Sequence, residues 1–304
     1  MTWPAPPGAY GAADPLFLLL IALAVEAYLG GHPLRPSWLP NPRRAVARIV
    51  GQLAHRLDRP RRGARALRLR GVCAIVAVAL SALLAGALIG WLTRHYPFAW
   101  IVELLLLGLL IDQRATWRQG EAVRAGLRAR SLIRAREALR PLAIERVAPA
   151  TIDGFAVPAI VITALDGLAR RFVDRLAAPV FWYVVAGLPG LFAQQAVYVA
   201  AATLGHGSAP FGAPARAANR ALALLPGLLA GFLLAMAAIF VPQGRPLAAL
   251  GALAKGAGAP GVLAAAIGAR LPLGRMTRGL GVFAVGCLID AGLVALLALG
   301  RLSL

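Results

Sequence analysis

Acidic residues are scarce in this sequence, and lysine is nearly absent. Of 304 residues, 12 are Asp or Glu and 32 are Lys or Arg, which gives a formal net charge of +20, and Lys255 is the single lysine. Charged residues make up 14% of the chain and hydrophobic residues 60%, whereas a soluble domain has about 25% and about 45–50%. This composition argues against a soluble globular enzyme, and the high hydrophobic content also argues against a disordered chain.

The sequence also lacks the common catalytic and metal-binding motifs. It has no Gly-rich phosphate loop ending in Lys-Ser/Thr, no Gly-x-Ser-x-Gly nucleophile elbow and no His-Glu-x-x-His pair. Its two cysteines, Cys73 and Cys287, lie inside apolar runs, and its four histidines are scattered. Neither a disulfide framework nor a Cys/His metal site is therefore predicted.

Long apolar runs are what the chain does have. A transmembrane helix needs about 20 mostly apolar residues, and four runs meet this requirement with at most one charge: 72–92, 177–204, 221–241 and 280–299. Weaker candidates, each with one acid, are 15–30, 97–111 and 152–165. The run 262–269 is too short to span, and we expect it to be re-entrant or packed inside the protein. The sequence therefore predicts an all-α polytopic transmembrane protein with about five to seven buried helices.

The arginines predict the orientation of these helices. Eleven lie in 35–70 and nine in 114–146, whereas the turn between the two blocks carries only Arg94 and His95. Because cytoplasmic loops are enriched in Lys and Arg, both blocks are predicted to be cytoplasmic and the turn near residue 95 external. We expect a single integral domain, 1–304, in the cell inner (cytoplasmic) membrane, with basic cytoplasmic loops at about 35–70 and 113–148.

The second basic block has the spacing of an amphipathic helix. Between residues 119 and 140 there is no proline, and apolar residues recur at Val123, Leu127, Leu132, Ile133 and Leu139. The simplest interpretation is a cytoplasmic amphipathic helix lying on anionic lipid headgroups. A docking surface for an anionic substrate is an alternative. A nucleic-acid partner is not expected, because no recognition motif accompanies the charge.

Ordered motifs give a resemblance to a known family. Residues 18–26 read Leu-Leu-Leu-Ile-Ala-Leu-Ala-Val-Glu, and Gly-Gly-His-Pro at 30–33, Trp-Leu-Pro-Asn-Pro-Arg at 38–43 and Ile-Val-Gly at 49–51 follow. Further on are Asp-Arg-Leu-Ala-Ala-Pro-Val-Phe-Trp at 174–182, Gly-Leu-Pro-Gly at 187–190, Gln-Ala-Val at 195–197 and Phe-Gly at 211–212. In order and spacing, these segments resemble the CobD/CbiB family of cobalamin-biosynthesis membrane proteins over about residues 20–275.

The chain departs from that family where the family has acids and amides. Four polar positions before the family's Ala-Pro-Leu-Phe segment correspond to Asp166, Arg170, Arg171 and Asp174, its Asn-Thr-Leu-Asp segment to 198–201, its Asp-Asp pair to Asn219 and Arg220, and a later Asn to Ala223. Arginines thus stand where a metal-binding acid would be expected, and an arginine there would repel the ion. We therefore expect the fold to persist while synthase activity is weak or absent.

The resemblance implies ATP-dependent amide formation, in which a carboxylate of adenosylcobyric acid is joined to aminopropanol or its phosphate. It implies ATP and Mg²⁺, although no motif for either is evident, and a corrinoid substrate. Anionic lipids and other cobalamin-pathway membrane proteins are further expected partners. On this basis Asp166 and Asp174 are the candidate catalytic residues, His206, Arg216 and Asn219 are the candidate substrate contacts, and metal ligands stay unknown.

Alternatives to a synthase remain open at this point. Asp166 and Asp174 lie eight residues apart, so that one helix face could carry both, but each could instead pair with the arginines at 170 and 171. A non-catalytic scaffold or accessory paralogue with the family fold is the second function class. A transporter is the third, suggested only by the embedded acids Glu26, Glu103 and Asp290.

Overall fold

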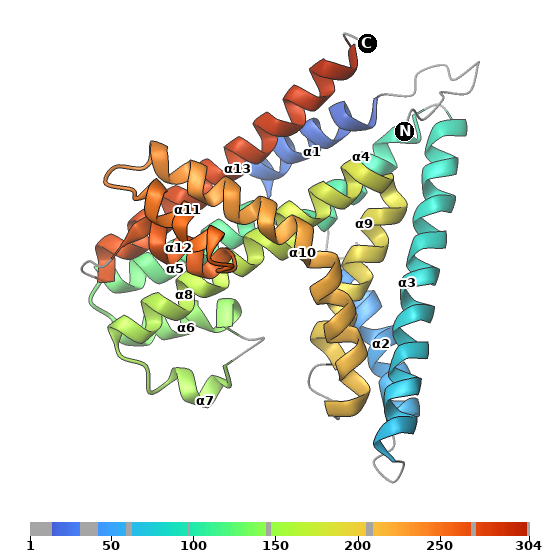
Figure 1. The fold of residues 1–304 in the computed structure, drawn as a ribbon, viewed down its shortest axis with the longest axis horizontal. Coiled ribbons are helices and arrows are strands. Elements are labelled where there is room, and N and C mark those ends of the chain that lie inside the picture. Colours follow the sequence, from blue (N-terminus) through green and yellow to red (C-terminus); the bar gives the residue numbers. More distant parts are fainter. Residues whose placement is uncertain are drawn as a thin grey trace.

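The computed structural model describes residues 14–30, 42–58, 63–96, 98–143, 147–204, 209–268 and 272–302, which fold into packed helices (Figure 1). No strand occurs in these ranges, so the predicted all-α class is confirmed. In chain order the elements are α1 (Pro15–Leu29), α2 (Pro42–Leu57), α3 (Ala64–His95), α4 (Trp100–Leu110), α5 (Gln113–Arg128), α6 (Leu132–Ala143), α7 (Pro149–Ile152), α8 (Val157–Phe172), the π-helical turn η1 (Val173–Ala177), α9 (Ala178–Leu204), α10 (Ala209–Phe240), α11 (Pro246–Ala254), α12 (Ala259–Ile267) and α13 (Pro272–Leu302).

Four stretches of the described chain are long and apolar enough to cross a membrane, as expected of an integral membrane protein. They are Ala64–His95, Val157–Leu204, Ala209–Phe240 and Pro272–Arg301. Each contains one of the four runs with at most one charge. Large apolar side chains on these helices, such as Leu84 and Leu288, are 65% and 71% exposed, which suits a surface that faces lipid rather than water.

The weaker apolar runs take other structures. Helix α4 has 11 residues, so it is about 17 Å long at 1.5 Å per residue and is too short for a hydrocarbon core of about 30 Å. Helix α1 has 15 residues. Of the run 152–165, Ile152 ends α7, and residues 157–165 form the first part of α8, which runs on through η1 into α9 instead of forming a separate span. Residues 262–267 of the short run lie in α12, where Val262, Leu263 and Ala266 are buried, so the packed interpretation is confirmed for these residues.

Helix α3 packs tightly along α9 and α10 because glycines let the backbones approach. A Cβ on Gly71 would lie 2.3 Å from the carbonyl oxygen of Phe211 in α10, and one on Gly86 would lie 2.7 Å from that of Leu188 in α9. Helix α9 bends at Gly187, whose φ of 64° favours glycine. Figure 1 shows α2, α3, α9 and α10 side by side. The first turns of α10 are therefore fixed beside the N-terminal end of α3.

The embedded acids Glu26, Glu103 and Asp290 are buried, and the first two have clear partners. Glu103 accepts hydrogen bonds from Thr93 Oγ1 (3.1 Å) and the Tyr183 hydroxyl (2.6 Å), which joins α4 to α3 and α9. Glu26 accepts from the backbone N–H of Arg114 (3.2 Å) at the start of α5, where an anion is favoured. Asp290 in α13 is 1% exposed, and its Oδ2 has no hydrogen-bond partner among the described residues.

The second basic block is a helical hairpin, not the single helix that the spacing suggested. Helix α5 ends at Arg128 and α6 begins at Leu132, and Arg130 between them has a positive φ of 52°. Val123 and Leu139 are fully buried, because the two halves of the hairpin pack against each other and against α8 and α13. Leu132 and Ile133, in contrast, are 38% and 70% exposed. Only part of the apolar face therefore packs on protein, and contact of this hairpin with lipid headgroups stays a prediction.

Candidate functional site

A pocket of about 830 Å³ opens where η1 meets α9, α10 and α12. One wall is formed by α8 and η1, and the facing wall by the end of α9 and the first half of α10. Residues just before α7 and at the start of α12 complete it. Ligand sites commonly enclose about 300–1,000 Å³, so this pocket has the size to hold a sizeable ligand or part of one.

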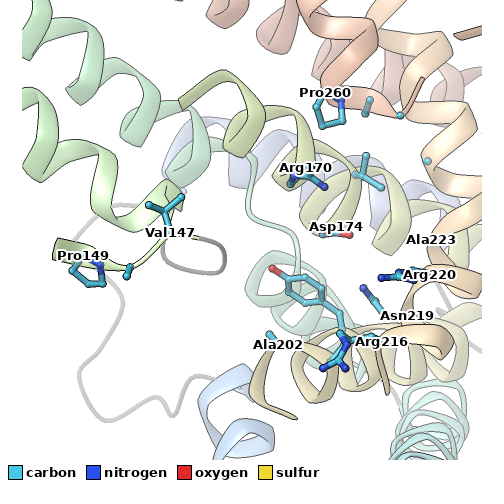
Figure 2. A pocket seen from close by; sticks show the side chains of 17 residues that line it. Val147, Pro149, Arg170, Asp174, Ala202, Arg216, Asn219, Arg220, Ala223 and Pro260 are labelled. Atoms are coloured by element: carbon cyan, nitrogen blue, oxygen red, sulfur yellow. The ribbon is translucent and has the colours of Figure 1, made fainter. Parts of the chain in front are cut away.

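Positive charge dominates the pocket. Arg170 and Asp174 come from α8 and η1, and Arg216, Asn219 and Arg220 come from α10. Figure 2 shows the two groups on facing walls. The part of the lining that the structure describes therefore carries three guanidinium groups and one carboxylate. Within the described ranges no group of three or more His, Cys, Asp or Glu side chains could hold a metal ion.

Three of the five residues predicted as site residues meet in this pocket: Asp174, Arg216 and Asn219. Asp166 does not line it. Its carboxylate instead accepts two hydrogen bonds from Arg170, at 2.7 and 3.0 Å, as the ion-pair interpretation proposed. Since Arg170 does line the pocket, Asp166 acts on the pocket only through that arginine. The predicted contact His206 lies outside the described residues.

Arg171, the other arginine that departs from the family pattern, points to a different part of the protein. It is 8% exposed and donates to Gln119 Oε1 in α5 and to the carbonyl oxygen of Pro141 in α6. It therefore ties α8 to the basic hairpin and does not line the pocket.

Comparison with known proteins identifies the family of this chain. The family model described as "CobD/Cbib protein" matches residues 19–272, which include the entire described lining of the pocket. The chain belongs to the CobD/CbiB family. No solved structure gives a significant match to it.

Relatives in the CobD/CbiB family carry names from one pathway. The "Cobalamin biosynthesis protein CobD" of Sinorhizobium sp is 31% identical over 198 residues, covering 64% of this chain and 58% of that protein. The protein of the same name from Rhizobium meliloti (strain 1021) is 30% identical over 198 residues, covering 65% and 59%. That of Brucella suis biovar 1 (strain 1330) is 26% identical over 226 residues, covering 73% and 68%. Family membership and these names support a role in cobalamin biosynthesis.

A second polar cluster adjoins the pocket, and it unites three of the CobD/CbiB-like motifs, those at 38–43, 174–182 and 195–197. Arg43 in α2 donates through Nε to Gln195 Oε1 (3.0 Å), through Nη1 to Asp112 Oδ2 (3.2 Å) and through Nη2 to the carbonyl oxygen of Leu110. Arg175 donates to the same Asp112 oxygen at 2.8 Å. Burial, and next the positive charge of Arg175, lower the pKa of Arg43, while Asp112 opposes the shift.

This cluster is connected to the pocket wall. Gln195 Nε2 donates to the carbonyl oxygen of Asp174 (3.3 Å), and the Arg175 side chain is hydrogen-bonded to Tyr198, which lines the pocket. Arg43 and Gln195 lie 152 residues apart in the sequence, so their meeting was not predictable from spacing. Asp112, which joins the two arginines, was missed because it stands alone after an apolar run and belongs to none of the motifs.

Proposed function

We propose that the chain acts in cobalamin biosynthesis by joining a corrinoid carboxylate to aminopropanol or its phosphate as an amide, and that the basic pocket is where this occurs. The observation that carries the proposal is the meeting of one carboxylate, Asp174, with three guanidinium groups in a pocket inside the family-matched region. Guanidinium groups bind carboxylates and phosphates through paired hydrogen bonds. Both anionic ends of the reactants thus have matching partners.

The chemistry assigns different tasks to the two kinds of side chain. Amide formation needs an activated carboxylate. In the reaction that the family resemblance implies, ATP transfers a phosphoryl or adenylyl group to the carboxylate, and the C–N bond forms as the C–O bond to that phosphate breaks and the phosphate leaves. The arginines would hold anionic oxygens and stabilise the charge that develops on them. Asp174 would accept a hydrogen bond from the incoming ammonium group and take its proton. Asn219, on the facing wall, would donate to a neutral amide or hydroxyl of the substrate.

A magnesium ion held by the protein does not fit these residues. Magnesium sites use oxygen ligands, usually one or two carboxylates together with substrate phosphates. Among the described lining residues, three guanidinium groups accompany a single carboxylate, and their combined charge repels a cation. We therefore assign the stabilisation of phosphate charge to the arginines and not to a metal ion held by the protein.

Packing supports a cytoplasmic opening in the inner membrane. The close approach of Gly71 to Phe211 places the start of α10, and with it Arg216, near the end of α3 that follows the first basic block. Positive-inside logic assigns that end to the cytoplasm, where nucleotides and soluble intermediates are available.

Labelling of single cysteines tests this topology. With Cys73 and Cys287 replaced by alanine, a cysteine at the exposed position His95 should react with a membrane-impermeant maleimide in intact cells. A cysteine at the exposed position Ala125 tests the second basic block separately. Positive-inside logic places this block in the cytoplasm and predicts reaction only after permeabilisation, whereas α4, which lies between residues 95 and 125, is too short to return the chain across the membrane. The reverse pattern would invert the orientation and put the pocket on the wrong side for this function.

Turnover of the purified protein tests the function itself. With adenosylcobyric acid, ATP and aminopropanol phosphate, we expect slow formation of the amide product, because the described lining of the pocket offers one carboxylate, that of Asp174, to act as a base. Mass spectrometry of the corrinoid would detect the product. The second candidate, a non-catalytic scaffold, is favoured by the same single carboxylate. Tight corrinoid binding with no product would support the scaffold and contradict the synthase.

A further inference from the structure

We propose that the basic pocket binds a phosphate group directly through Arg170, Arg216 and Arg220, without a divalent cation. This inference deepens the proposed function, because it concerns the same pocket, but it is a statement about binding and holds whether or not the amide forms. The ligand class is an organic phosphate or a di- or triphosphate, such as the phosphate of the amine or the phosphates of ATP.

The first support is the arrangement of Arg216 and Arg220. They lie four residues apart on α10, so both project from one helix face. Like charges at this spacing destabilise a helix, and Arg220 has no ion pair with any described residue. An anion between the two guanidinium groups removes this repulsion.

The second support is that two of the arginines are already held in place. Asp166 grips Arg170 through two hydrogen bonds, at 2.7 and 3.0 Å. Arg216 donates from Nη2 to the carbonyl oxygen of Ala209 (3.1 Å). Each of these partners engages only part of a guanidinium group, which has five donors. The remaining donors are pre-oriented, and this reduces the entropy that is lost when a phosphate binds.

The third support is the placement of the opposing walls. Figure 2 shows Arg170 on the α8–η1 wall and Arg220 on the α10 wall, with Asp174 between them. A phosphate bound there is approached by cations from two sides and by one carboxylate. Without a metal ion, the Asp174 carboxylate repels the phosphate. If a divalent cation lay between Asp174 and the phosphate, the carboxylate would instead hold the cation and so favour phosphate binding. The sign of its effect therefore separates the two binding modes.

Calorimetric titration of the full chain in neutral detergent tests this proposal. The probe is sodium pyrophosphate, measured in EDTA and again in MgCl₂, and we expect binding in EDTA that magnesium does not tighten. Parallel titrations with inorganic phosphate, ATP and aminopropanol phosphate distinguish a nucleotide source from the amine's phosphate. Binding that requires magnesium, or no binding of any of the four probes in EDTA, would overturn the proposal.

Variants give the inference its sharpest test. Arg220→Gln should weaken pyrophosphate binding about tenfold, the value of one charge-assisted hydrogen bond. Arg301→Gln, which removes an exposed arginine at the far end of α13, is the charge-matched control and should leave the affinity unchanged. Asp174→Asn should tighten binding about threefold by removing a repulsive charge, a gain that a misfolded protein would not show. Weaker binding in Asp174→Asn would point to a bridging cation and contradict the proposal.

This test and the turnover assay can fail separately. Metal-free pyrophosphate binding without amide product would refute the synthase and leave the phosphate site standing. Amide product with strictly magnesium-dependent pyrophosphate binding would do the opposite.

Discussion

Replacing Asp112 by alanine is expected to lower the free energy of unfolding by about 3 kcal/mol, at the low end of the cost of breaking a buried ion pair. Asp112 Oδ2 receives both Arg43 (3.2 Å) and Arg175 (2.8 Å), whose side chains are only 14% and 19% exposed. Removing the carboxylate leaves two guanidinium groups close together, with little water to replace it. Both the desolvation cost and their mutual repulsion then oppose folding.

The matched control for this prediction is Asp153→Ala. Asp153 also forms an ion pair with an arginine, Arg140, but the two side chains are 57% and 49% exposed. Such exposed pairs contribute about 0–1 kcal/mol. Unfolding of both variants would be followed by tryptophan fluorescence during titration of detergent-solubilised protein with SDS. Equal losses of stability in the two variants would mean that Asp112 does not neutralise the buried arginines.

A compensating change tests the physical cause. Arg43→Met in the Asp112→Ala background removes one of the two unneutralised charges and keeps an unbranched apolar stem in its place. We expect it to recover part of the lost stability, whereas Arg43→Met alone should be destabilising because it breaks the bonds to Gln195 and Asp112. Opposite signs of the same substitution in the two backgrounds would establish the charge coupling.

Hydropathy predicted the long helices well because the property that defines a span is local. The four runs with at most one charge each lie in a helix long enough to cross a membrane. It predicted the shorter elements less well, since an apolar run of 11 to 15 residues suits a buried helix as much as part of a span. Helices α1, α4 and α12 owe their positions to packing against the rest of the chain, which no local window contains.

The basic hairpin is a second case in which local sequence could not predict a structure that tertiary packing determines. Residues 119–140 have helical apolar spacing throughout, and the break at Arg130 has neither a glycine nor a proline to mark it. A Cβ on Gly126 would lie 2.7 Å from the backbone nitrogen of Ala135. This close approach of α5 to α6 requires the chain to reverse. The turn is therefore imposed by tertiary contact, and local spacing could not indicate it.

For the candidate site, the order of the motifs along the chain predicted which residues share the pocket, but not how the two acids lie relative to it. Asp174, Arg216 and Asn219 do share a pocket, because the segments that carry them adjoin the motifs that gave the family resemblance. The sequence could not separate Asp166 from Asp174, since two positions eight residues apart on a regular helix lie only about 80° apart around its axis. The structure separates them: Asp174, in the π-helical turn at Val173–Ala177, lines the pocket. Asp166 pairs with Arg170 outside it.

This separation predicts unequal losses of activity from two otherwise equivalent substitutions. Asp174→Asn should reduce amide formation by about 100-fold or more, the usual contribution of a positioned general base. Asp166→Asn should reduce it less than about tenfold, because it only loosens a partly exposed pair that orients Arg170. Both changes remove one negative charge and one proton acceptor from the same helical segment, so each controls for the other.

The measurement is initial rate against amine concentration, together with pyrophosphate affinity for both variants. For Asp174→Asn we expect kcat to fall while metal-free pyrophosphate binding becomes tighter, since the same carboxylate that takes the proton also repels the phosphate. For Asp166→Asn we expect both quantities to change little and in the same direction, because Arg170 becomes less well ordered. Equal losses of kcat in the two variants would show that Asp174 is not the general base. Both acids would then have the structural role in ion pairs that their spacing to the arginines first suggested.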